Sequence, residues 1–136
     1  MTFRLLTLGI ALSLMLLTSQ SSYAFELSGA WATNASACKK VFGISSSGAP
    51  FLKGDSDLFG GGFIIRGNEI VGKIAKCSIL KMNQNKNVVH LMAACSTDVA
   101  LANVQFAFKI NSDNNITRIY PGMEDLNVNY VRCTSK

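Results

Sequence analysis

Four cysteines are the residues of this 136-residue chain with the widest choice of chemistry. Cysteine can ligate a metal, act as a nucleophile or form a disulfide, and the spacing of the residues favours one of these uses. None of the four stands in a C-x-x-C pair, which is typical of zinc and redox sites. An even number of widely separated cysteines in an exported chain indicates two disulfides: the residues are Cys38, Cys77, Cys95 and Cys133.

A predicted β-hairpin carries two of these cysteines. Residues 77–83 and 88–95 are rich in apolar side chains and flank Gln84-Asn-Lys-Asn87, whose polar composition is typical of a turn. A turn centred in the middle of this tetrapeptide sets the first arm against the second in antiparallel register.

The register of that hairpin predicts the disulfide connectivity. With the turn so centred, Cys77 faces Cys95 at a separation that a disulfide spans. Cys38 and Cys133, near the two ends of the exported part, then pair with each other by elimination. A one-residue slip of the register would turn Cys77 and Cys95 to opposite faces and prevent the bond.

His90 is the single histidine and lies on the second arm of the hairpin. A metal site would have to recruit it across distant segments, and catalysis would require a placed nucleophile or carboxylate beside it. No motif surrounds any serine, and the cysteines are assigned to disulfides. We therefore predict no catalytic residue, no metal site and no cofactor. An enzyme that uses His90 with Asp or Tyr partners ranks behind the two functional hypotheses given at the end of this subsection.

Asp55-Ser-Asp57 followed by Gly60 matches the opening of a calcium-binding loop. The twelfth position of such a loop must be a bidentate glutamate, and in this chain it is Arg66. The motif therefore predicts a solvated loop and no cation site.

Two arginines are candidates for holding an acidic ligand. Arg118 and Arg132 have the same strand parity as their apolar neighbours Tyr120 and Tyr130. If the strands form a small barrel, these side chains point inward, where they either bind an anion or extend their charged ends to the rim.

Residues 1–24 are typical of a secretory signal peptide. Arg4 supplies a positive charge, Leu5–Leu17 is almost wholly apolar, and Ser22-Tyr-Ala24 ends the segment with small residues at the cleavage positions. The apolar run is shorter than the roughly 20 residues that span a bilayer, and no cysteine near the cleavage point supports a lipoprotein. We predict that residues 25–136 form one periplasmic or secreted domain with no transmembrane segment after cleavage.

The formal net charge of +5 is spread along the chain. Lys39-Lys40 and the pair Lys73 and Lys76 come nearest to clusters, and they are typical of solvated surface. The distribution does not favour a nucleic-acid partner.

The first part of the exported chain predicts one strand, one short helix and a long irregular segment. Phe25–Ala32 indicates a strand, and the helix begins after Thr33 or Asn34 and ends at Gly43. Residues 44–62 are rich in serine and glycine and predict the longest loop, a suitable place for a binding surface.

Strand signals then follow closely to the end of the chain. Alternation of apolar and polar residues is clearest over 104–110, where the even positions are expected to face inward. Besides this strand and the central hairpin, we expect a hairpin over 63–71 that turns at Gly67-Asn68, a strand over 116–120 and a last strand over 126–130.

These elements predict an all-β fold with one short N-terminal helix. Seven or eight short antiparallel strands in one small domain favour a compact barrel or a strongly curved sheet, because an open sheet would leave long edges unpaired. A bond between Cys38 and Cys133 would bring the ends of the chain together, as closure requires.

Leu27-Ser-Gly-Ala-Trp31, with Cys38 shortly after it, resembles the opening of the small periplasmic metalloprotease inhibitors of Gram-negative bacteria. The resemblance implies an eight-stranded lipocalin-like barrel and an inhibitory activity. In that family the stretch before the motif enters the protease cleft, and after cleavage Phe25 and Glu26 precede it in this chain. The whole chain also resembles small exported proteins of α-proteobacteria, which implies no activity.

Two functional hypotheses follow. The first is a non-enzymatic binding or inhibitory module of the cell envelope, whose partner is an envelope or secreted protein. The alternative is a carrier that holds a small apolar ligand in the barrel, suggested by Trp31, Phe106, Phe108 and Tyr120. The candidate contact residues for a ligand or partner are Trp31, Phe51, Asp55, Asp57, His90, Arg118 and Tyr120.

Overall fold

A computed structural model describes residues 24–134 of the protein. The predicted signal peptide, residues 1–24, lies outside the described residues except for Ala24. None of the helices within 24–134 has the length and apolar character needed to cross a membrane.

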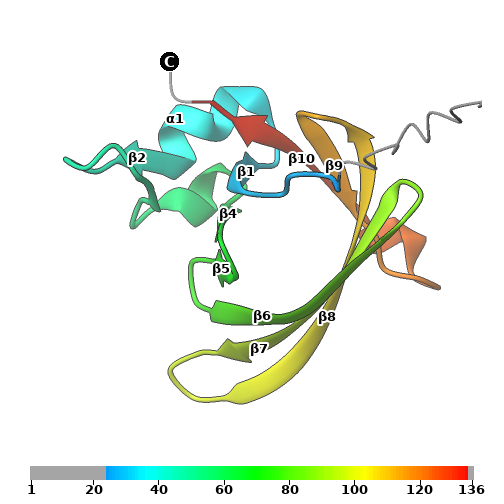
Figure 1. Ribbon diagram of the computed structural model, residues 1–136. Helices are drawn as coiled ribbons and strands as arrows, with labels where there is room; N and C mark the ends of the chain where they lie inside the picture. Colours follow the sequence, from blue (N-terminus) through cyan, green and yellow to red (C-terminus); the bar gives the residue numbers. More distant parts are fainter. Residues whose placement is uncertain (1–23, 135–136) are drawn as a thin grey trace, which may run out of the picture.

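Eight antiparallel strands close into a barrel, so the predicted all-β fold is confirmed (Figure 1). The order around the barrel is β1-β10-β9-β8-β7-β6-β5-β4. Short connections join the strands from β4 to β9, the chain leaves the barrel after β1 and after β9, and the last strand, β10, closes the ring by pairing with β1. The strands are β1 (Gly29–Ala32), β4 (Gly62–Arg66), β5 (Glu69–Val71), β6 (Lys76–Asn85), β7 (Val88–Ser96), β8 (Leu101–Ser112), β9 (Asn115–Arg118) and β10 (Val128–Cys133).

The central hairpin of β6 and β7 has the predicted cysteine pairing but a different turn. Asn85 pairs with Val88, so the two-residue turn is Lys86-Asn87, later than expected, and Lys86 has a φ of 54°. Continued regularly, this register would set Cys77 opposite Ser96. Leu80 is an extra residue in β6, a β-bulge that shifts the ladder back by one position, and Cys77 therefore faces Cys95.

Both predicted disulfides are confirmed. Cys77 is bonded to Cys95 within the hairpin, and Cys38 is bonded to Cys133 across a sequence separation of 95 residues. No free cysteine remains among residues 24–134. Two disulfides are typical of a protein that folds in an oxidising, non-cytoplasmic compartment.

The predicted first strand is wrong over residues 25–28. The backbone turns at Gly29, whose φ of 137° is readily available only to glycine, and β1 begins there. The segment before it bridges two walls of the barrel, because the Phe25 amide donates to Gln84 of β6 and Arg132 of β10 donates to the Glu26 carbonyl. Residues 25–28 therefore lie across one end of the barrel.

The short helix forms where it was predicted but ends earlier. It consists of a 3₁₀ turn, η1 (Ala35–Ala37), followed by α1 (Cys38–Val41), and the Asn34 side chain caps it by accepting from the Ala37 amide at 2.9 Å. The expected end at Gly43 is wrong. Phe42 instead begins a strand whose backbone pairs with a later segment, so tertiary pairing overrides the glycine stop signal.

That later segment lies within residues 44–62. These residues were predicted to form an irregular loop, and this prediction is wrong. Strands β2 (Phe42–Ile44) and β3 (Pro50–Leu52) form a two-stranded sheet, and a 3₁₀ helix, η2 (Ser56–Phe59), follows. Figure 1 shows α1 and β2 outside the ring of strands. These elements cover the outer side of β1 and β4, where the apolar side chains of Ala30, Ala32, Val41, Phe42 and Ile64 form a second small core.

The last two predicted strands are partly misplaced. β9 ends at Arg118, because Tyr120-Pro121 turns the chain away, and the predicted strand to residue 120 is too long. Leu126 belongs to a 3₁₀ turn, η3 (Glu124–Leu126), and is exposed, whereas the prediction placed it in β10. The hairpin at Gly67-Asn68 and the inward even positions of β8 are confirmed.

Candidate ligand cavity

The interior of the barrel is filled at one end and hollow at the other. The filled end holds the main core around Leu27, Trp31, Leu91, Phe108 and Ile116, each of them buried. Above this core lies a cavity of about 390 Å³. Its lining consists of Gly62, Phe63, Ile70, Gly72, Ala75, Cys77, Cys95, Thr97, Ala100, Ala102, Val104, Phe106, Phe108, Arg118 and Tyr130.

The hollow follows from the size of the inward side chains along β8. From the open end downward, the inward positions are Ala102, Val104, Phe106 and Phe108. Small residues at the mouth leave space that large aromatic residues close further down. The inward residues of β7 show the same trend. Cys95 and Ala93 lie nearer the mouth than the larger Leu91. The barrel is therefore open at one end and closed by packed side chains at the other.

Arg118 is the single charged residue in the cavity lining. Its position directly across from Phe108 and Val128 turns the side chain inward, as predicted from the strand parity. The guanidinium carbon lies 4.7 Å from the centre of the Phe106 ring and 4.8 Å from that of Tyr120. Within residues 24–134, this guanidinium makes no hydrogen bond and no ion pair with another side chain.

Tyr130 adds a hydroxyl group to the cavity lining. Its ring packs edge-on against Phe63 with the centroids 4.9 Å apart. Burial raises the pKa of the Tyr130 hydroxyl above its ordinary value of 10.0, although the charge of Arg118 acts in the opposite direction. The hydroxyl therefore stays protonated at neutral pH and can donate a hydrogen bond.

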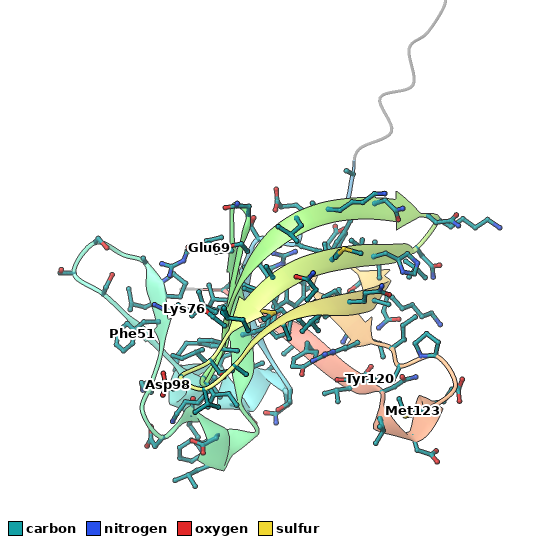
Figure 2. All side chains as sticks on the ribbon, turned by 90° about the horizontal axis from the view of Figure 1, so that it is seen from below. Phe51, Glu69, Lys76, Asp98, Tyr120 and Met123 are labelled. Atoms are coloured by element: carbon teal, nitrogen blue, oxygen red, sulfur yellow. A yellow bond between two sulfur atoms is a disulfide. The ribbon has the colours of Figure 1, made fainter. Side chains whose placement is uncertain are left out.

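Two loops beside the mouth present apolar side chains to solvent. Ile74, in the loop between β5 and β6, is 79% exposed, and Val99, between β7 and β8, is 94% exposed. Leu101 at the start of β8 is 85% exposed. Figure 2 shows Lys76 and Asp98 near these loops and Tyr120 and Met123 on the connection after β9.

The opposite end of the barrel is closed by Arg132, which was predicted to point inward with Arg118. Its guanidinium carbon lies 4.3 Å from the Trp31 ring centre, and its N–H groups donate to the backbone carbonyls of Glu26, Ser28 and Asp113. These three hydrogen bonds engage three of the five N–H groups of Arg132 and tie residues 25–28 to the barrel.

The other candidate contact residues do not gather at the cavity. Trp31 is fully buried in the packed end of the barrel, and Phe51 lies on β3 outside the barrel, where its ring covers Gly43 (Figure 2). His90 is exposed on the outer face of β7 between Asn83 and Ala107, with no carboxylate or tyrosine in the shallow pocket around it. Of the predicted set, Arg118 and Tyr120 are brought together.

The two aspartates lie at η2, outside the barrel. Asp57 forms an exposed ion pair with Lys73, with 3.1 Å between Oδ1 and Nζ, and this hydrogen bond lowers the pKa of the Asp57 carboxyl. No group of three or more His, Cys, Asp or Glu side chains within residues 24–134 is arranged to hold a metal ion.

Sequence reasoning missed most of the cavity lining. It singled out large aromatic residues, whereas the mouth is formed by small ones such as Ala75, Ala100 and Ala102. The signal was present in β8, where the inward positions grow from alanine to phenylalanine along the strand.

Comparisons with known proteins were made for the whole chain. Searches of protein-family models, of curated proteins and of solved structures found no match. The resemblance of Leu27–Trp31 to the metalloprotease inhibitors therefore stays a prediction.

Proposed function

We propose that this protein is an exported, periplasmic or secreted, non-enzymatic binding protein that holds a small apolar ligand in the open end of its barrel. The observation that supports this proposal is the cavity of about 390 Å³, whose lining is apolar except for a few polar groups. Ligand sites in proteins have this character and typically measure 300–1,000 Å³. Burial of the ligand's apolar surface would supply most of the binding free energy.

Binding of an envelope or secreted protein is the second candidate. The exposed side chains of Ile74, Val99 and Leu101 favour it, because exposed apolar clusters often mark contact sites. These residues border the mouth of the cavity, so a partner seated on them would also control access to a ligand. Insertion of the N-terminal segment into a protease is less well supported, because Arg132 and Gln84 bind residues 25–28 to the barrel.

A titration with N-phenyl-1-naphthylamine, a neutral apolar dye that fluoresces when shielded from water, tests the proposal. We expect one dye per chain. Val104→Trp fills the middle of the cavity and should weaken binding at least roughly tenfold. Met92→Trp adds the same side chain on the outer face of β7, 38% exposed, and should leave binding unchanged.

Ala102→Phe provides a second blocked variant at the mouth in case Val104→Trp does not fold. Formation of both disulfides and wild-type circular dichroism identify folded variants. Failure of the dye to bind the wild type, or equal binding by the blocked and outer-face variants, would refute the carrier proposal. Native mass spectrometry of the freshly purified protein then shows whether a ligand is retained, and a pull-down from the envelope tests the second candidate.

A further inference from the structure

The polar groups of the cavity carry information about the ligand beyond its apolar character. Arg118 is a permanent cation, because a guanidinium does not lose its proton at ordinary pH. It is only partly exposed, lines an apolar cavity and has no carboxylate bonded to it among residues 24–134. Partial burial of an unpaired charge is costly, and a buried charge is normally matched by an opposite one.

The surroundings of Arg118 hold the guanidinium while leaving its donors free. The guanidinium carbon of Arg118 lies over the rings of Phe106 and Tyr120, 4.7 and 4.8 Å from their centres, as in cation–π contacts, in which arginine commonly stacks on the ring face. The N–H groups lie in the plane of the group, so stacking does not use them. Arg132 is the internal comparison, because it stacks on Trp31 in the same way and spends its donors on three backbone carbonyls.

We propose that the ligand is an amphiphile with an anionic head group, a carboxylate or a phosphate, which Arg118 binds while the apolar body lies in the cavity. This inference rests on the proposed carrier function and deepens it. The Tyr130 hydroxyl, protonated at neutral pH, is a further donor on the cavity wall. The apolar body contacts Phe63, Val104 and Phe106, and the disulfide Cys77–Cys95 forms part of the wall.

Displacement of N-phenyl-1-naphthylamine by octanoate, octyl phosphate and 1-octanol tests the inference. The three competitors share one apolar chain and differ in the head group. We expect at least one anion to bind the wild-type protein roughly tenfold or more tightly than the alcohol, as a charge-assisted hydrogen bond implies. The anion that does so identifies the head group.

Variants then assign the preference to Arg118. In Arg118→Gln the preference for the anion over 1-octanol should disappear while 1-octanol still binds, and Arg118→Lys should retain part of it. Lys109→Gln is the matched control, because Lys109 is exposed on β8 beside the position of Arg118 but faces outward, and it should change nothing.

The outcomes separate the two proposals. Binding of 1-octanol as tight as that of both anions, or a preference that survives in Arg118→Gln, would overturn the anionic ligand and leave the carrier function standing. Absence of binding by all three competitors and by the dye would overturn both. If Arg118→Gln does not fold, comparing the binding of the anions with that of 1-octanol in the wild type and in Arg118→Lys still tests whether the ligand has an anionic head group.

Discussion

At the scale of single residues, Arg118 and Arg132 have the same sequence signature and different surroundings. Both follow the inward parity of their strands, and both guanidinium groups lie against aromatic rings. The carbonyl groups of Ser28 and Glu26 that engage Arg132 are 104 and 106 residues away in the chain. Strand parity predicts the direction of an arginine, but only the closed barrel determines whether its donors are already used.

Replacing Arg132 with methionine should destabilise the fold. The substitution keeps an apolar stem over Trp31 but removes the donors to three backbone carbonyls. We expect the free energy of unfolding to fall by about 2 to 4 kcal/mol in urea titrations. Arg66→Met, at an exposed position of β4, is the control and should cost less than about 0.5 kcal/mol. Equal effects of the two substitutions would show that Arg132 does not secure the end of the barrel.

Glu26 should make the stability depend on pH. Its carboxylate accepts a hydrogen bond from the Ser28 amide at 2.7 Å, and hydrogen bonding by Ser28, followed by the charge of Arg132, holds its pKa below the ordinary value of 4.5. The folded-state pKa is the lower one, so the contribution is fully present above about pH 4.5 and is lost as the pH falls through the folded-state pKa.

Melting temperatures of the wild type and Glu26→Gln between neutral and acidic pH measure this contribution. The variant should melt lower near neutral pH, and the gap should narrow as the pH falls below about 4.5. A gap that stays constant across this range would mean that ionised Glu26 does not stabilise the fold.

At the scale of elements, the central hairpin shows that a correct pairing can follow from an incorrect turn. Placing the turn in the middle of Gln84–Asn87 assumed a regular ladder, whereas the centre of the actual turn lies one residue later and the bulge at Leu80 compensates. No local sequence signal marks the bulge, because an extra apolar residue in a strand has ordinary strand propensity. The long apolar alternation of β8 was predictable for the opposite reason, since its periodicity is uninterrupted.

Two single deletions in the central hairpin, one in each strand, test the role of this bulge. Removal of Leu80 leaves the pairs on both sides unchanged, Ile79 with Ala93 and Lys81 with Met92, so Cys77 should still bond to Cys95. Removal of Ala94 from β7, which loss of the bulge in β6 cannot compensate, moves Cys95 opposite Ser78 and should leave free thiols or a mispaired disulfide. Non-reducing peptide mapping distinguishes the two, and an intact Cys77–Cys95 peptide in both deletions would contradict the register.

The segment between the helix and the barrel was the least predictable part of the chain. Phe42 and Gly43 have the pattern of a helix end, and the serine-rich stretch after them has no strand periodicity. The two strands formed there have three residues each, and they exist because Phe42 packs into the second core while its backbone pairs with Leu52. Such short strands depend on tertiary contacts, which local patterns do not record.

At the scale of the whole molecule, closure of the barrel brings Cys38 and Cys133 together and creates the cavity. The bond between Cys38 and Cys133 joins the helix after the first strand to the end of the last strand, with 5.6 Å between the Cα atoms. The number of strands, the alternation and the cysteine count predicted a compact barrel or a strongly curved sheet. The hollow end was not predicted, because it depends on how the sizes of side chains from seven strands add up in space.

The two disulfides should differ in their effect on stability. In the chain-entropy account, the bond that closes the loop of 95 residues contributes about 4 to 5 kcal/mol, and the one that closes 18 residues about 3 kcal/mol. Cys38→Ala with Cys133→Ala should therefore lower the free energy of unfolding more than Cys77→Ala with Cys95→Ala does. The reverse order in urea titrations would indicate that the hairpin bond does more than restrict the unfolded chain.

The central claim is that the hollow end of the barrel binds a ligand. Chemical-shift mapping of the ¹⁵N-labelled protein during a titration with N-phenyl-1-naphthylamine tests this claim most directly. We predict that the largest amide shifts cluster around the mouth, in residues 72–75, residues 97–100 and the first half of β8, with Arg118 and Tyr130 across the cavity. Shifts centred on the closed end at Phe25 and Gln84, or on the outer face around His90, would contradict the account.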